Sequence, residues 1–130
     1  MQLSHRILIA DDDTEVRLGA VELLASLGLE ILEAETGNEA LAIARRESKG
    51  LHLALLDFHM PGQSGLDVLL AMRDETLEVP CIFWSGDATD AMASYALSSG
   101  ARAFLRKPVR PDELRCEVRR VLDETWGNRG

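Results

Sequence analysis

Short apolar runs alternate with longer amphipathic stretches along this chain, and the alternation limits the fold more than any other feature of the sequence. The apolar runs have the length of strands, and the stretches between them repeat apolar residues at helical spacing. The expected strands are 6–10, 30–34, 51–56, 80–84 and 103–105. The expected helices are 14–27, 36–47, one that begins after Ser64, 89–98 and 111–125. These five βα units predict an α/β fold with a parallel sheet that helices cover on both faces.

Residues typical of helix ends mark several of these boundaries. Thr36 followed by Glu39 is the pattern of a capping box, and Ser64 followed by Asp67 repeats it. Gly28 is typical of the end of a helix. We therefore expect helices to begin after Thr36 and Ser64, and the first helix to end before Gly28.

Length, charge and cysteine content narrow the class of protein. The 130 residues are expected to form one domain, 1–130, with a core that needs no disulfides. A formal net charge of −8 disfavours direct binding to nucleic acid or to an anionic membrane. The sequence shows neither a secretion signal nor an apolar run as long as a membrane span. With only 2 cysteines, a cytoplasmic protein with reduced thiols is expected.

Polar residues follow the expected strands at the points where the strands end. Asp11 and Asp12 follow the first strand, Asp57 the third, Ser85 the fourth and Lys107 the fifth. Because ligand sites of parallel sheets lie beyond the carboxyl ends of the strands, these side chains are expected to meet at one edge of the sheet. Asp13, the next residue in the same loop, is interpreted as the N-cap of the first helix.

Such a cluster of carboxylates needs a cation, because ionised carboxylates repel one another. Mg²⁺ prefers oxygen ligands and binds together with phosphate oxygens. A carboxylate beside the ion can attack phosphorus and form an acyl phosphate, while an ammonium and a hydroxyl stabilise the transferred group. The residues thus indicate magnesium-dependent phosphoryl transfer.

Four segments resemble the receiver domains of two-component response regulators and are similar to the single-domain chemotaxis regulator. They are residues 7–13 (ILIADDD), 55–62 (LLDFHMPG) with Gly65, 83–86 (FWSG) and 104–108 (FLRKP). Their order and separation match the family from one end of the chain to the other. The resemblance implies a flavodoxin-like, doubly wound sheet with strand order 2-1-3-4-5.

The resemblance also implies a role for each acidic residue. It makes Asp57 the phosphoacceptor and Asp12 a direct magnesium ligand. Asp11 is expected to bind the ion through water or to tune the pocket. Asp57 itself and the backbone carbonyl of His59 complete the implied metal ligands.

Further roles are implied for residues of the last two strands. Ser85 matches the switch hydroxyl that bonds the phosphoryl group, and Phe104 matches the aromatic residue that moves inward with it. Lys107 matches the ammonium that pairs with Asp57 and then with the phosphoryl oxygens. A cis peptide bond before Pro108 is expected to direct Lys107 toward the site.

The implied function is a phosphorylation-controlled switch rather than an enzyme, with only self-phosphorylation and self-dephosphorylation chemistry. The phosphoryl donor would be a sensor histidine kinase or a phosphotransfer protein. Phosphorylation would change the surface of the fourth helix, fifth strand and fifth helix, and thereby control a downstream protein or output domain. A phosphorylation-dependent homodimer is also compatible with the family.

Three residues near the site depart from the usual family choices: Trp84, His59 and Asp87. We expect His59 and Asp87 to flank the phosphoryl group. With His59 protonated, the two could form a charged cover that slows the approach of water. The alternative is that the His59 side chain points into solvent and only its carbonyl matters.

Two other classes of protein remain as alternatives. An aspartate-based phosphatase of the haloacid dehalogenase type would use Asp11 and Asp13, but Glu15 stands where that motif needs Thr or Val, and the chain is short for that fold. A flavodoxin-like cofactor binder would need a phosphate-binding loop after the first strand. The loop here is acidic and would repel a phosphate without a metal.

Overall fold

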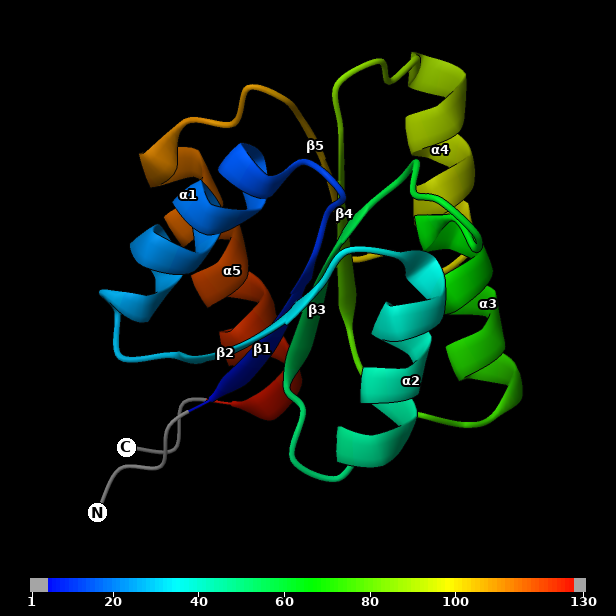
Figure 1. Cartoon of the computed structure of the whole chain (residues 1–130), viewed down its shortest axis with the longest axis horizontal. Coiled ribbons are helices and arrows are strands. Elements are labelled where there is room, and N and C mark those ends of the chain that lie inside the picture. The colour runs from blue at the N-terminus through cyan, green and yellow to red at the C-terminus, as the bar shows by residue number, and fades with distance from the viewer. Residues whose placement is uncertain (1–4, 128–130) are drawn as a thin grey trace.

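A computed structural model describes residues 5–127, and it shows one sheet of parallel strands in the order β2-β1-β3-β4-β5 (Figure 1). The strands are β1 (Arg6–Ala10), β2 (Glu30–Ala34), β3 (Leu53–Asp57), β4 (Cys81–Ser85) and β5 (Ala103–Arg106). The helices are α1 (Thr14–Ala25), α2 (Gly37–Glu47), α3 (Gly65–Asp74), α4 (Asp90–Ser98) and α5 (Pro111–Trp126). The predicted fold class and strand order are confirmed.

Helices cover both faces of the sheet. Figure 1 shows α1 and α5 on one side and α2, α3 and α4 on the other. Consecutive residues of β3 point into different cores: Leu53 and Leu55 pack with α1 and α5, whereas Ala54 and Leu56 pack with the other layer. All four side chains are fully buried. This burial on both faces explains why the central strands are continuous apolar runs in the sequence.

β1 pairs in parallel with β2 on one side and with β3 on the other. The order in which successive strands are added to the sheet therefore reverses between β1 and β3. The carboxyl ends of β1 and β3 therefore lie next to each other at a topological switch point. Ligand sites in sheets of this kind form at such a point. None of the helices formed by the described residues has an apolar stretch that could cross a membrane.

Several predicted boundaries were wrong by one or two residues. β3 begins at Leu53 rather than at residue 51, and β4 begins at Cys81 because Pro80 has no N–H to donate to the ladder. The first helix ends at Ala25 rather than at residue 27, and a turn carries the chain to Gly28, whose φ is 84°. That left-handed conformation favours glycine.

The predicted helix starts are confirmed in part. Ser64 and Asp67 form a complete capping box. At α2, Thr36 accepts a hydrogen bond from the N–H of Glu39, but the Glu39 carboxylate accepts from Glu35 rather than from Thr36. The expected box there is therefore only half formed.

Candidate functional site

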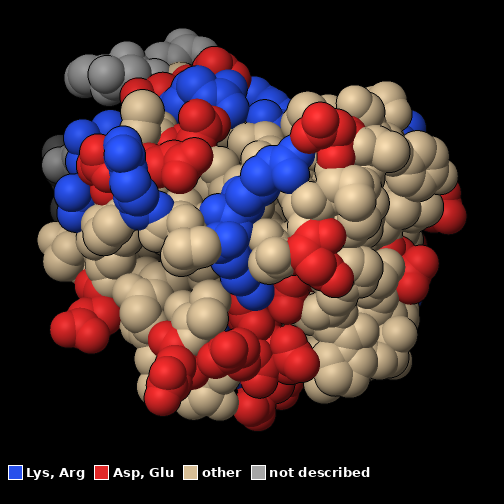
Figure 2. Space-filling model, turned by 90° about the horizontal axis from the view of Figure 1, so that it is seen from above, with Lys and Arg blue, Asp and Glu red and all other residues tan. Residues whose placement is uncertain are grey.

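The carboxyl ends of four strands bring the predicted polar residues together. Asp11 and Asp12 follow β1, Asp57 is the last residue of β3, Ser85 is the last residue of β4, and Lys107 follows β5. Figure 2 looks onto this edge of the sheet and shows acidic side chains gathered beside basic ones. We call this the carboxyl edge.

Asp11 is fully buried and its oxygens are paired. One carboxylate oxygen lies 2.6 Å from Lys107 Nζ, and the other accepts a hydrogen bond from the N–H of Asp13 at 2.9 Å. Its backbone carbonyl accepts a bond of 2.8 Å from Arg17 Nη1. Asp11 is thus fixed in place by the start of α1 and by the loop after β5.

Asp57 lies beside this pair and is only 6% exposed. One carboxylate oxygen is 3.5 Å from Lys107 Nζ, and the other accepts a bond of 3.3 Å from the N–H of His59. Burial and the neighbouring Asp11 carboxylate raise the pKa of Asp57 to about 6, and Lys107 opposes that rise. Lys107, expected to pair with Asp57, makes its shorter contact with Asp11.

The donor set fits a magnesium ion. Asp11, Asp12 and Asp57 each offer a carboxylate oxygen, and these oxygens all lie within 4.8 Å of one another. Asp12 is exposed, whereas the other two are buried. Hard oxygen donors on an open site that can also admit water are what Mg²⁺ prefers.

Ser85, Asp87 and His59 form a chain of contacts beside Asp57. Ser85 is 1% exposed, and its hydroxyl donates a hydrogen bond of 3.0 Å to Asp87 Oδ1. The same Asp87 oxygen lies 3.4 Å from His59 Nε2. The structure therefore brings together the two residues that the sequence placed at the flanks of the site.

Phe104 lies on β5 behind these residues. It pairs in register with Phe83 and is half-buried against the core of α2, α3 and α4. Its ring centroid is 5.5 Å from that of Phe58, the residue after Asp57. The Lys107–Pro108 peptide bond is cis, and the N–H of Lys107 donates to the Ser85 carbonyl at 2.8 Å.

Arg17 helps to position Asp11, and the sequence reasoning missed it. It is 7% exposed, and besides its bond to the Asp11 carbonyl it makes a 2.9 Å ion pair with Glu33. Its position was detectable, because Arg17 precedes the buried Ala20 by three residues and therefore lies on the same face of α1. A cation on the buried face of a helix is a signal for a partner at the sheet edge.

Comparisons with known proteins agree with this geometry. Residues 7–119 match the family of response regulator receiver domains. The transcriptional activator protein ExaE of Pseudomonas putida is 36% identical over 118 residues, which cover 89% of this chain and 54% of that protein. The chain spans about half or less of the length of the curated relatives it matches.

Solved structures of other proteins share this fold. A CheY-like response regulator receiver domain protein of Methanospirillum hungatei has a TM-score of 0.85 at 32% identity, with 94% of this chain and 96% of that chain covered. A response regulator receiver domain protein of Clostridium thermocellum has a TM-score of 0.87 at 27% identity, with 94% and 97% covered.

Proposed function

This chain belongs to the response regulator receiver domain family, and on that premise we propose that Asp57 accepts a phosphoryl group from a phosphohistidine of a sensor histidine kinase or phosphotransfer protein. Receiver domains are regulatory, phosphoryl-accepting switches of two-component systems rather than enzymes in the usual sense. The residues allowed three classes of protein: a receiver domain, an aspartate-based phosphatase and a flavodoxin-like cofactor binder. The family match shows the receiver domain.

One observation carries the assignment of Asp57. Asp57 is the carboxylate that ends the central strand, and it lies beside two further carboxylates and the ammonium of Lys107. In the proposed step an oxygen of ionised Asp57 forms a bond to phosphorus as the bond from phosphorus to the donor imidazole breaks. The bonding electron pair goes to the imidazole nitrogen, which takes a proton from solvent.

The remaining residues of the edge support this transfer. Asp11, Asp12 and Asp57 would hold Mg²⁺, with the carbonyl of His59 as a further oxygen donor. When bound, the ion supplies positive charge that offsets the carboxylates and the phosphoryl oxygens. Lys107, already 2.6 Å from Asp11 and 3.5 Å from Asp57, is within reach of a phosphoryl oxygen on Asp57.

A route to the surface begins at Ser85. Its hydroxyl donates to Asp87 at 3.0 Å, so a phosphoryl oxygen on Asp57 would compete for that donor. Arg106 on β5 ties the loop after Ser85 to the sheet, since it donates to the Ala88 carbonyl at 2.9 Å and to Asp90 at 2.6 Å. Movement of Ser85 would therefore reach the first turn of α4.

The helix at the end of this route is loosely attached. Ala96 is the single buried residue of α4, while Tyr95 is 58% and Leu97 46% exposed. Phe104 is half-buried against the core of α2, α3 and α4, and we propose that its packing changes together with that of Ser85. We infer that phosphorylation shifts the surface of α4, β5 and α5 and so controls a downstream protein or output domain.

His59 and Asp87 are proposed to cover the acceptor on its exposed side. Their side chains are 55% and 78% exposed, yet they lie 3.4 Å apart, with Asp87 also bonded to Ser85. Hydrolysis needs a water molecule that approaches phosphorus in line with the Asp57 oxygen. Two side chains across that approach would slow it.

The proposed function is tested by intact mass spectrometry. Acetyl phosphate or phosphoramidate with magnesium is expected to add one phosphoryl group to the wild-type protein and none to Asp57→Asn. Asp74→Asn, which changes an exposed aspartate at the end of α3, is the matched control and is expected to react like the wild type. Equal modification of Asp57→Asn and wild type would refute the assignment.

A further inference from the structure

Lys107 has three partners at the carboxyl edge, two carboxylates and one aromatic ring. Besides Asp11 at 2.6 Å and Asp57 at 3.5 Å, its ammonium lies 5.1 Å from the centroid of the Trp84 ring. A cation within about 6 Å of an aromatic face is attracted to it electrostatically, and more strongly where both groups are shielded from water. Here the lysine side chain is 17% exposed and Trp84 is 3% exposed. The ring is therefore a candidate to hold the lysine in place.

The sheet fixes the backbone of Trp84 and of Lys107 relative to the acceptor. Trp84 is the partner of Asp57 in the pairing of β3 with β4, and its carbonyl accepts a hydrogen bond of 2.9 Å from the N–H of Phe58. Lys107 is tied to the next residue of β4, because its N–H donates to the Ser85 carbonyl at 2.8 Å. Both side chains therefore start from set positions beside Asp57.

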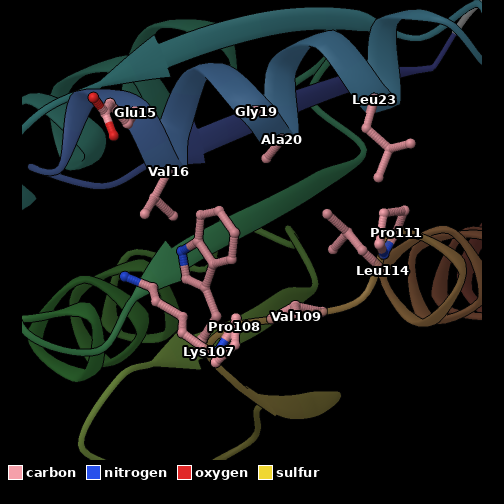
Figure 3. Close-up of a pocket in the computed structure, with 11 residues that line it drawn as sticks. Glu15, Val16, Gly19, Ala20, Leu23, Lys107, Pro108, Val109, Pro111 and Leu114 are labelled. Atoms are coloured by element: carbon pink, nitrogen blue, oxygen red, sulfur yellow. The ribbon is translucent and has the colours of Figure 1, made fainter.

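Packing alone does not fix the lysine side chain. Lys107 and Trp84 line a cavity of about 310 Å³ between α1 and the loop that joins β5 to α5. Figure 3 shows Lys107 and Val109 on one side of this cavity and Val16 of α1 on the other. Glu15 lines it too and offers the ammonium a different carboxylate. A long, flexible side chain beside open space and a competing anion needs a further contact to stay at the acceptor.

The choice of tryptophan at this position also needs an explanation. The Trp84 Nε1 atom is buried and has no hydrogen-bond acceptor among the described residues, whereas Trp126 Nε1 donates to the His52 carbonyl at 2.8 Å. A buried N–H without an acceptor costs free energy. A phenylalanine would avoid that cost, but tryptophan attracts a cation to its face more strongly than phenylalanine does. Features that cost stability are typical of functional sites, so the N–H without an acceptor points to a function of the ring face.

We propose that Trp84 is a positioning residue that holds the Lys107 ammonium on its indole face, beside the buried carboxylates and within reach of the phosphoryl oxygens. Transfer then does not have to immobilise the flexible lysine, because the free protein already keeps it in place. No bond to Trp84 forms or breaks in this step. The inference rests on the proposed role of Asp57, but the position of the lysine is measurable in unphosphorylated protein.

Carbon-13 NMR of the lysine Cε groups tests the contact directly. The sequence has two lysines, Lys49 and Lys107, and Lys49→Arg assigns their signals. The ring current of the indole is expected to shift the Lys107 Hε protons upfield of those of Lys49. Trp84→Leu should remove this upfield shift, and Trp84→Phe should retain part of it. Lys107 signals that coincide with those of Lys49 in the wild type, or that do not change in Trp84→Leu, would overturn the proposal.

The rate of phosphorylation tests the consequence. With acetyl phosphate and magnesium, intact mass spectrometry should show Trp84→Leu reacting about three- to tenfold more slowly than the wild type, with Trp84→Phe between them. Trp84→Met, which packs more adaptably and has no aromatic face, replaces Trp84→Leu if that variant does not fold. Ile82→Val removes one carbon atom from the same core, two residues earlier on β4, and as the matched control should react like the wild type.

The outcomes separate this proposal from the role of Asp57. A wild type that reacts on Asp57, together with an equally fast Trp84→Leu, would overturn only the proposal. No reaction of the wild type would refute the role of Asp57 and the proposal with it.

A double-mutant cycle separates positioning from packing. If Trp84 acts through the ammonium, adding Trp84→Leu to Lys107→Met should slow phosphorylation by less than about twofold, because no cation remains for the ring to hold. A slowing as large as in the wild-type background would show that the indole matters only for packing, and would overturn the proposal.

Discussion

The two edges of the sheet differ in how far their charged side chains are offset by opposite charges. At the carboxyl edge, Asp11, Asp12 and Asp57 lie together with the single ammonium of Lys107. At the amino edge, where the strands begin, Arg6 lies between two carboxylates, at 2.7 Å from Glu47 and 3.4 Å from Glu30.

Neutral polar groups at the amino edge have hydrogen-bond partners, whereas Arg6 Nε makes no hydrogen bond with the described residues and has only its ion pair with Glu30. His52 Nδ1 accepts a hydrogen bond of 3.0 Å from the Arg6 N–H, and the His52 carbonyl accepts one from Trp126. The His5 and Trp126 rings pack edge-on against the His52 ring. The charged groups of the amino edge thus lie beside groups of opposite charge. The carboxyl edge instead holds like charges close together, and a cation would be needed to offset them. Arrangements that cost stability are typical of functional sites, so the close carboxylates mark the carboxyl edge as the functional one.

Removing the one ammonium of the carboxyl edge is expected to have the largest effect on stability. Lys107→Met keeps the apolar stem and leaves buried Asp11 and Asp57 without their cation. We expect a loss of about 2–3 kcal/mol in the free energy of unfolding at neutral pH with EDTA present, measured by urea denaturation. Arg6→Met is the matched change at the amino edge and should cost less, because water can reach Glu30 and Glu47. Equal losses would remove the distinction between the edges.

Removing one negative charge from the carboxyl edge should act in the opposite direction. Asp57→Asn eliminates a buried carboxylate whose pKa is raised from 3.8 to about 6. We expect a gain of roughly 1–3 kcal/mol at neutral pH without divalent ions.

The sign of the pH dependence follows from that raised pKa. Between 3.8 and about 6 the unfolded chain releases this proton and the folded protein keeps it, so the wild type loses stability as the pH rises through that window. Asp57→Asn should lack this fall. The check is urea denaturation across the window with EDTA, and Asp74→Asn is the control. Parallel curves for wild type and Asp57→Asn would contradict the expectation.

The general layout of the site was predictable from the sequence because it depends on topology. Apolar runs mark strands, the carboxyl ends of parallel strands meet, and Asp57, Ser85 and Lys107 follow such runs. Gly65 belongs to the matched motif for a steric reason that only the structure shows. A Cβ there would lie 2.5 Å from the carbonyl oxygen of Asp57.

The choice of partner within the cluster could not be predicted. Lys107 contacts Asp11 more closely than Asp57, and Glu39 bonds to Glu35 rather than completing a box with Thr36. Differences of about 1 Å between competing acceptors depend on side-chain rotamers and packing, which neither periodicity nor spacing encodes. That the Trp84 indole N–H has no acceptor among the described residues could not be predicted from the sequence for the same reason.

A smaller effect is expected at the mouth of the carboxyl edge. Asp87→Ala removes the side chain that bonds Ser85 and approaches His59, and His59→Asn shortens the other side chain of the cover. Both should shorten the phosphoryl half-life several-fold, because water then reaches the phosphorus more easily. Decay of the phosphorylated mass after removal of the donor measures it, with Asp74→Ala as control. Half-lives equal to that of the wild type would show that no such cover exists.

The smallest effect is expected at the amino edge, with a sign opposite to that of Asp57. Burial first, and then the charges of His5 and Arg6, lower the pKa of His52 below its ordinary value of 6.5. Its Nδ1 also accepts a backbone hydrogen bond, which a proton on that atom would abolish. As the pH falls below 6.5 the unfolded chain binds a proton that the folded protein does not, so stability decreases on acidification.

His52→Asn tests this contribution, because the amide oxygen can accept from the Arg6 N–H but does not titrate. The difference in unfolding free energy between wild type and His52→Asn should therefore shrink as the pH falls below 6.5. The unfolding free energy of the wild type, relative to that of Asp57→Asn, should increase as the pH falls below about 6. Urea denaturation of the three proteins over one pH series measures both slopes. Slopes of the same sign would mean that the two edges do not differ in the way their buried groups respond to charge.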